Sequence, residues 1–415
     1  MREEILLNID RPEVLERLYR QNKRGFTHDF VQVYPEIRDQ VIARVWMERL
    51  SGVGDEHTWG ERGEILRIFM ASILAFLIAK IPEIFGIDEE FFYTRNISFI
   101  VFPILGAYFA WKQKIAAWRL GLVGLMLSIS VVYVNILPPL RTSDTLTLAF
   151  FHLILFVWSL VGFIYVGDSD RPLQKRLEFL RYNGDLLVMG TIIFIAGMIL
   201  TAITVGLFKL IALNIEEFYF RYIGIFGLAA APLLATYLVQ VNPQLVGRVS
   251  PVIARIFTPF VLIMLISYLV AVFYTGKNPY TDREFLLIFN LLLAGVLAII
   301  LFSVADGIQR QTRNKTEVGL LLALSLVTIL VNGIALSAIV FRINEWGITP
   351  NRLAVLGSNI LILTNLILVA WRLLYSLKTN CNTELVGKTI AWFLPIYTAW
   401  AAFVTFTFPV IFGYK

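Results

Sequence analysis

The sequence has little of what a soluble metalloenzyme or a disulfide-bonded domain needs. Cys381 is the only cysteine, which excludes an intrachain disulfide and a cysteine-based metal cluster. Only 16% of the residues are charged, against about 25% in an average soluble domain. The three histidines stand far apart along the chain. We therefore expect no metal site and no cofactor.

Motifs of common enzymes are missing as well. The chain contains no His-Glu-x-x-His, no Gly-x-Ser-x-Gly and no Gly-x-x-x-x-Gly-Lys-Ser/Thr phosphate-binding loop. We assign no catalytic residue and favour a protein that is not an enzyme. His152 lies in an apolar run, where the simpler interpretation is a hydrogen-bonded packing histidine and the alternative is a proton relay.

Apolar residues are abundant: they make up 58% of the chain, and the mean hydropathy is +0.72. From Ile65 onward, long apolar runs alternate with short polar connections. A transmembrane helix needs about 20 apolar residues, and these runs lack the alternation of membrane strands. We therefore predict an all-α, polytopic transmembrane helix bundle over residues 65–415. Its spans, about eleven in number, are expected at 65–85, 96–111, 117–137, 145–166, 186–208, 220–241, 254–275, 285–305, 318–341, 353–377 and 388–412.

The lysines and arginines of the connections predict how the spans are oriented, because cytosolic loops are enriched in both. If the N-terminus is cytosolic, the inner connections hold fourteen of them and the outer connections eight. We therefore expect a cytosolic N-terminus and an outer C-terminus. Segment 96–111 is short, and omitting it would spoil the bias. With its basic residues between apolar runs, the net charge of +6 favours membrane lipids over nucleic acid as the partner.

Residues 1–64 predict a small cytosolic helical segment. Pro12 marks the start of one helix, and a third apolar stripe runs over 37–50. Between them, Phe26, Phe30 and Tyr34 recur every four residues in a helix that we expect Pro35 to end. We expect these few helices to pack on each other and on the cytosolic face of the spans. Residues 10–50 could then receive a cytosolic protein partner.

The tenth predicted span carries a polar row, since Asn351, Ser358, Asn365 and Arg372 recur every seven residues and share one helix face. Arg372 must snorkel or pair, and we predict a pair with Asp306. With neighbouring polar residues of the eighth and ninth spans, this row could be hydrogen-bonding glue, a solute or ion path, or a catalytic pocket. The candidate polar seam comprises Asn290, Asp306, Ser325, Thr328, Asn332, Ser358, Asn365 and Arg372.

The connection after the ninth predicted span is the best candidate for an external site. Gly347 is typical of a helix C-terminus, and Thr349-Pro350 of the start of the next helix. The charges around the turn could pair with one another, and a structural turn is the simplest interpretation. The residues of this candidate external turn are Arg342, Glu345, Trp346, Gly347 and Arg352.

Segment 342–352 reads Arg-Ile-Asn-Glu-Trp-Gly-Ile-Thr-Pro-Asn-Arg. It resembles the R-I-x-x-x-G-x-T-x-x-R stretch of domain-of-unknown-function family 4153. Segments 15–20 and 45–50 are similar to the openings of such proteins. The resemblance implies a bacterial multi-pass protein of the cytoplasmic (inner) membrane. It implies no activity, so it assigns no catalytic residue.

Three functions from different classes stay open. Transport of a small solute, ion or lipid through the polar seam predicts a cavity at the midplane and is slightly favoured, because nearly the whole chain lies in the membrane. A sensor or scaffold signalling through its N-terminal helices predicts a dry bundle and an exposed apolar groove within residues 10–50. A membrane enzyme acting on lipid or envelope precursors would need a cleft with convergent ionisable groups. The sequence does not predict the oligomeric state.

Overall fold

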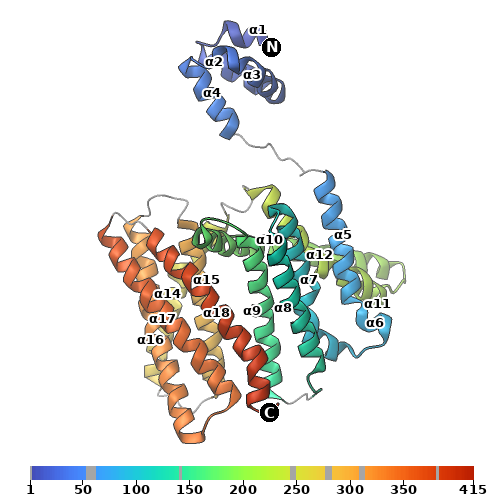
Figure 1. The fold of residues 1–415 in the computed structure, drawn as a ribbon, viewed down its shortest axis with the longest axis vertical. Coiled ribbons are helices and arrows are strands. Elements are labelled where there is room, and N and C mark those ends of the chain that lie inside the picture. The colour runs from blue at the N-terminus through green and yellow to red at the C-terminus, as the bar shows by residue number, and fades with distance from the viewer. Residues whose placement is uncertain are drawn as a thin grey trace. The chain divides into compact units, whose positions relative to one another are not determined.

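The computed structural model describes residues 2–52, 62–139, 143–243, 249–275, 283–307, 314–379 and 383–415. Within these ranges the chain is helical and forms no strand, as an all-α fold requires (Figure 1). The chain divides into two compact units: an N-terminal unit, residues 1–62, and a helical bundle, residues 63–415. The boundary lies two residues before the predicted one.

The N-terminal unit is a small helical domain built around an aromatic core. The rings of Tyr19, Phe26 and Trp46 are all buried, with the Trp46 ring centroid 5.1 Å from that of Phe26 and 5.6 Å from that of Tyr19. The side chain of Asn22 accepts a hydrogen bond from the Gly25 N–H and so caps the third helix. The helices are α1 (Arg2–Leu7), α2 (Pro12–Gln21), α3 (Lys23–Ile37) and α4 (Val41–Gly52).

Two expectations for this unit were wrong. Helix α1 was not predicted, yet Ile5 from it is fully buried in the core. Pro35 does not end α3, which continues to Ile37. A proline there removes one backbone donor, but Val33 and Ile37 are buried in the core. Their burial offsets the loss, so packing and not local propensity decides where this helix ends.

Nine of the eleven predicted spans lie in a single helix of the bundle to within one residue, whereas 65–85 is divided between α5 and α6 and 220–241 runs over η1 and α12. Helix α7 extends well beyond the short predicted segment 96–111. The first turns of α7 carry charged and polar residues, so the predicted apolar run did not include them. The bundle helices are α5 (Arg62–Ala79), α6 (Ile81–Phe85), α7 (Glu89–Gln113), α8 (Ala117–Ile136), α9 (Asp144–Val166), α10 (Pro172–Leu210), α11 (Glu216–Phe218), the π-helix η1 (Tyr219–Gly224), α12 (Ile225–Val241), α14 (Val249–Thr275), α15 (Arg283–Gly307), α16 (Lys315–Trp346), α17 (Pro350–Lys378) and α18 (Glu384–Ile411).

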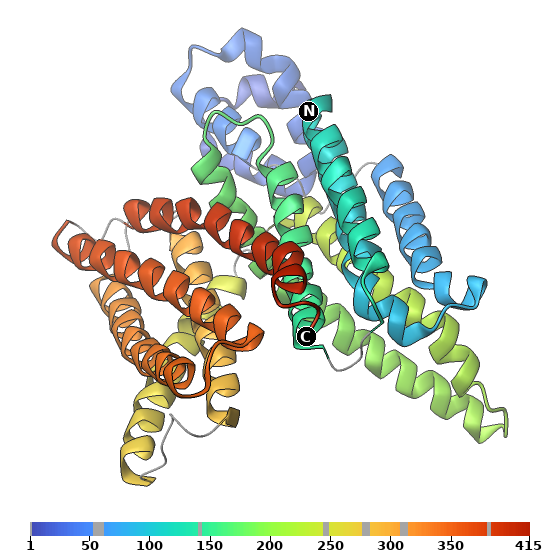
Figure 2. The same cartoon turned by 60° about the horizontal axis from the view of Figure 1, so that its bottom comes forward.

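The bundle contains two main apolar cores. One is formed by α5, α7, α8, α9, α10 and α12 with Ala401 of α18, and the other by α14 to α18 with Leu177 and Leu180 of α10. Helices α9, α10 and α18 join the two halves, because α18 packs on both α9 and α10 (Figure 2). This central position places the C-terminal helix against residues far earlier in the chain; for example, the Tyr133 hydroxyl donates to the Phe406 carbonyl.

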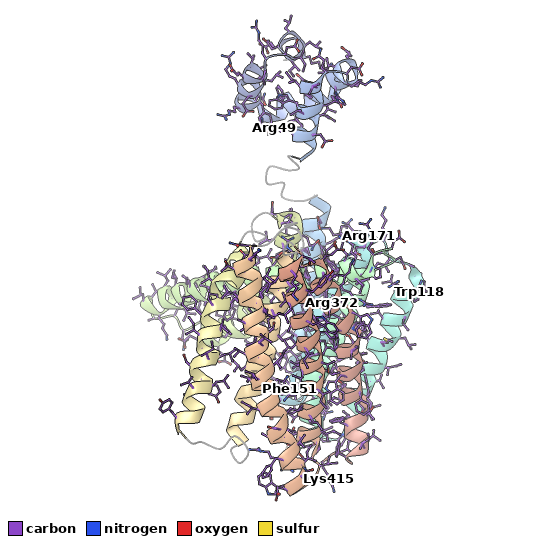
Figure 3. The ribbon with its side chains drawn as sticks, turned by 90° about the vertical axis from the view of Figure 1, so that its left-hand side faces the viewer. Arg49, Trp118, Phe151, Arg171, Arg372 and Lys415 are labelled. Atoms are coloured by element: carbon purple, nitrogen blue, oxygen red, sulfur yellow. The ribbon has the colours of Figure 1, made fainter. Side chains whose placement is uncertain are left out.

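The helices alternate in direction, and hydrogen bonds join the ends that an up-and-down path brings together. At one end, the Arg119 guanidinium bonds the Asp168 carboxylate, and Arg176 donates to the carbonyl of Ala391. At the other end, the Thr405 hydroxyl donates to the carbonyl of Ala149. Figure 3 shows the same division, with Arg171 and Arg372 toward one end of the bundle and Lys415 at the other.

The outside of the bundle is apolar over long stretches. Residues 187–210 of α10 expose aliphatic and aromatic side chains on nearly every face, and Leu210 is 83% exposed. Such a surface needs lipid around it. Among the described residues, seven helical segments are long and apolar enough to cross a membrane: α8, α9, α10, the continuous α11–α12 segment, α16, α17 and α18. The protein is therefore polytopic, and the count of about eleven spans stays a prediction.

A first prediction concerns the N-terminal unit. Residues 1–62 expressed alone should unfold in one cooperative thermal transition, and Trp46→Ala should abolish it. Loss of a buried tryptophan costs about 3–5 kcal/mol, which is as much as a core of this size supplies. Circular dichroism against temperature measures both.

Val31 is the matched control, because it lies on α3 and is largely exposed. Val31→Ala should change stability by no more than about 0.5 kcal/mol. A fragment that melts without cooperativity, or a Trp46→Ala fragment as stable as the parent, would contradict a separate core.

Candidate functional site

The residues of the candidate polar seam lie on α15, α16 and α17, and α17 packs against both α16 and α18. On α16, Ser325, Thr328 and Asn332 are completely buried. The Asn332 side-chain amide donates to the Asn359 carbonyl of α17, at 3.2 Å. The two hydroxyls donate to carbonyls of their own helix, one turn earlier. These three side chains therefore supply one interhelical hydrogen bond and two that stay within α16.

The predicted polar row of α17 faces α18 instead. The indole N–H of Trp400 donates to the Ser358 hydroxyl, at 3.0 Å, and the Asn365 amide donates to the Tyr397 hydroxyl, at 2.9 Å. Gly357 makes this approach possible, because a Cβ at this position would lie only 2.1 Å from the Trp400 ring. The indole thus packs directly on the backbone of α17.

The seam is therefore two separate polar contacts on different sides of α17. Ser358 and Asn365 contact α18, whereas Asn332 contacts α16. The Oδ1 atoms of Asn332 and Asn365 are buried and have no hydrogen-bond partner among the described residues. Spare hydrogen-bonding capacity exists at both contacts, but the two belong to different interfaces.

The remaining seam residues are not drawn into either contact. Arg372 is exposed, and its guanidinium forms no ion pair with a described residue. Asn290 and Asp306 lie on α15, and their side chains lie outside the described residues. The pairing of Arg372 with Asp306 therefore stays a prediction.

The candidate external turn is held together by its own side chains. Gly347 ends α16 in a positive-φ conformation (φ +77°), as glycine favours, and the Thr349 hydroxyl accepts from the Arg352 N–H to cap α17. The Arg352 guanidinium donates to the carbonyls of Trp346 and Gly347, at 3.0 and 2.7 Å. It therefore binds the C-terminus of α16, where a cation is favourable.

The pairing that we expected among the charges of this turn is not seen. Glu345 is exposed and forms no ion pair with a described residue, because Arg352 binds backbone carbonyls instead. Arg342 is buried, with its guanidinium carbon 5.9 Å from the centre of the Trp346 ring. These contacts describe a structural turn. The described residues of this connection present no cluster of side chains with a common ligand.

The buried Arg95 binds the C-terminal end of α8. From the sequence, this residue was counted only among the connections. Arg95, on α7, donates to the carbonyls of Val134, Leu137 and Pro138. These carbonyls have no partner in their own helix, so the guanidinium both satisfies them and complements the helix dipole. Asn96 and Asn135 exchange hydrogen bonds beside it.

Two further polar clusters come from residues that are distant in sequence. At the start of α5, the buried Glu64 carboxylate accepts from the Tyr108 hydroxyl and from Lys112 of α7. Directly after the end of α5, Lys80 is buried and pairs with Glu83 of α6, whereas an isolated lysine would extend toward water. Periodicity within one helix carries no signal for such contacts between helices.

The N-terminal unit has an open groove between α2 and α4. Its volume is about 500 Å³, and Pro12, Glu13, Glu16, Ile42, Val45, Trp46 and Arg49 line it. Val45 is 60% exposed, and Val41, one turn earlier on the same helix, is 65% exposed. The groove therefore combines an apolar floor with a charged edge.

The charges of the groove are arranged around Glu16. Its carboxylate binds the guanidinium groups of Arg20 and Arg49, and both bonds hold the pKa of Glu16 below its usual value. Arg49 also stacks over Trp46, with its guanidinium carbon 4.6 Å from the ring centre. Glu13 forms no ion pair with a described residue, so one carboxylate at the groove is left without a cation.

A second hollow, of about 340 Å³, lies in the bundle at the connection between α9 and α10 and is lined by charged residues such as Asp168, Arg171 and Lys175. His152 is partly buried, and its Nδ1 lies 2.8 Å from the Leu148 carbonyl of its own helix, a packing arrangement. No group of three or more metal-ligating side chains occurs in the described part of the chain.

Comparisons with protein-family models, curated proteins and solved structures found no match for this chain. The resemblance to family 4153 stays a prediction.

The contact between Gly357 and Trp400 gives a second prediction. Gly357→Ala should lower the stability of the detergent-solubilised protein by about 1–3 kcal/mol, because the added methyl group overlaps the indole. Trp400→Leu in the same chain should remove most of this additional cost. Thermal unfolding in detergent measures it.

Gly333, on α16, is the control, since a Cβ there meets nothing within 4 Å. Gly333→Ala should be neutral or slightly stabilising. Equal effects of the two alanine substitutions would show that the indole does not pack on α17.

Proposed function

We propose that the protein is a polytopic membrane scaffold or sensor that recruits a soluble protein through the groove of its N-terminal unit. The observation that carries the proposal is the exposed apolar surface of α4, where Val41 and Val45 flank the groove. In a separately folded unit outside the lipid, a contiguous apolar surface is typical of a binding site.

The expected occupant is an amphipathic helix of a cytosolic partner. An aliphatic side chain of that helix would enter between Ile42, Val45 and Trp46, the usual manner in which a helix binds an apolar groove. A lysine or arginine of the partner would face Glu13. Residues 1–62 carry ten basic and twelve acidic residues, so the charge of the whole unit also favours a basic partner.

Transport through the polar seam has less support. The seam is divided between two sides of α17, and most of its described polar side chains already donate or accept a hydrogen bond. Neither described hollow lies inside the bundle between α16, α17 and α18. An enzyme acting on lipid or envelope precursors also has less support, because the hollow at the α9–α10 connection holds ionisable groups of which Asp168 already pairs with Arg119 and Lys175 with Glu178.

The proposal includes about eleven spans, a cytosolic N-terminal unit, an outer C-terminus and a bacterial cytoplasmic membrane. Its support is the excess of lysine and arginine in the connections on one side. Membership of family 4153 is part of the same proposal and is supported by segment 342–352 alone.

Photocrosslinking tests the docking surface in the full chain. The full chain, with a photoreactive amino acid in place of Val45, is expressed in the source cell and irradiated. The partner peptide that becomes crosslinked to position 45 is then sequenced. The expected product joins position 45 to the apolar face of a helical segment that carries a lysine or arginine. Glu13→Lys should reduce its yield at least about fivefold, because a like charge then meets the partner.

The same photoreactive residue at Val31, which is exposed on α3 away from the groove, is the control and should not give this product. A product with the protein's own bundle, with a second copy or with lipid would refute the proposal. So would an unchanged yield after Glu13→Lys.

A further inference from the structure

The last turns of α17 present a stripe of aromatic and basic side chains on the outside of the bundle. Trp371, Tyr375 and Lys378 follow one another at intervals of four and three residues, so they share one helix face. All three are exposed, Trp371 by 68%, and Arg372 lies exposed beside them. In Figure 3, Arg372 lies toward the same end of the bundle as Arg171.

The depth of this stripe matches the boundary between hydrocarbon and headgroups. Asn365 stands at the centre of the predicted span 353–377. At a rise of about 1.5 Å per residue, Arg372 lies about 10 Å from it and Lys378 about 20 Å. The hydrocarbon ends about 15 Å from the midplane. Tyr375, about 15 Å from Asn365, therefore lies at the level of an interfacial aromatic belt, and Trp371 lies about 6 Å deeper. The long side chains of Arg372 and Lys378 reach toward the headgroups.

Among the described residues, the positive charges of this stripe have no acidic partner. Neither Arg372 nor Lys378 forms an ion pair with a described residue. Two basic groups at the same end are paired, in contrast: Lys388 binds the Glu384 carboxylate at 2.6 Å, and Arg119 binds the Asp168 carboxylate. Arg372 and Lys378 therefore stand exposed beside two exposed aromatic rings in the last turns of α17.

We propose that this face, formed by Trp371, Arg372, Tyr375 and Lys378, binds the headgroup of an anionic phospholipid. The planar guanidinium of Arg372 suits two oxygens of the lipid phosphate, and Lys378 supplies a second cation nearer the water. The two rings border the glycerol and the start of the acyl chains. The site belongs to the bundle alone and does not depend on the docking groove of the N-terminal unit.

Quenching of tryptophan fluorescence tests the site in the full chain. Brominated phosphatidylglycerol is titrated into the protein in a neutral detergent while tryptophan fluorescence is recorded. The fluorescence of Trp371 is obtained by subtracting that of a Trp371→Phe variant. Saturable quenching is expected with phosphatidylglycerol and not with brominated phosphatidylcholine. Each basic residue near a membrane surface contributes about fivefold in affinity. Lys378→Gln should therefore weaken binding about fivefold, and Arg372→Gln with Lys378→Gln about 25-fold.

Lys388→Gln is the matched control, because Lys388 is exposed at a similar depth on α18 but already paired; it should change the affinity less than about twofold. Asp306→Asn should change nothing. Equal quenching by the two lipids, or a double variant that binds like the parent, overturns the proposal. Tighter binding after Asp306→Asn also overturns it, since Arg372 would then be held by Asp306. Trp371, Arg372, Lys378 and Lys388 are exposed, so their variants are expected to fold; circular dichroism checks the folding of every variant.

Discussion

A polar group without a partner is costly in hydrocarbon, and this constraint explains most of the contacts inside the bundle. Water cannot satisfy such a group there, so another part of the protein must. Arg95 satisfies the last carbonyls of α8, and Trp400 bonds Ser358 across two helices. Apolar packing alone does not distinguish one neighbour from another in lipid, because the lipid is itself apolar. The hydrogen bonds therefore help to set which helices meet, and at which depth.

The positions of the helices could be predicted from the sequence with few errors. Runs of bilayer length coincide with helices of the bundle, and the spacing of Phe26, Phe30 and Tyr34 correctly predicts α3. Both features depend on residues close together in the sequence, so the length of an apolar run or the helical spacing of its residues is enough to predict them. The end of α3 could not be predicted, because the burial of Ile37 in a core assembled from four helices outweighs the local effect of Pro35.

The arrangement of the polar residues was harder to predict. A seven-residue interval correctly predicts that Ser358 and Asn365 share a face of α17, but it does not identify the helix that meets this face. Asn332 was assigned to the same seam, yet it bonds on another side of α17. Arg95 was counted with the connections, although it is one of the most deeply buried charges. Each difference concerns a partner distant in sequence, and spacing within one helix cannot identify such a partner.

The two units differ in charge in a way that fits different partners. The N-terminal unit carries slightly more acidic than basic residues, whereas residues 63–415 carry twenty-six basic and eighteen acidic residues. An anionic lipid surface attracts the second kind of unit and not the first. The apolar surface of α4 and the cationic end of α17 therefore fit the partners proposed for them, a soluble protein for α4 and a phospholipid for α17.

Cysteine labelling tests most directly whether the helices cross the membrane in the proposed order. Cys381→Ser gives a chain without cysteine, into which a single cysteine is placed at Arg17, Lys175 or Glu345. A membrane-impermeant maleimide is then added to sealed right-side-out membrane vesicles. The account predicts labelling at position 345 alone, and at all three positions once the vesicles are opened. Labelling at position 17 or 175 in sealed vesicles, or protection of position 345, would contradict the path of the chain through the membrane.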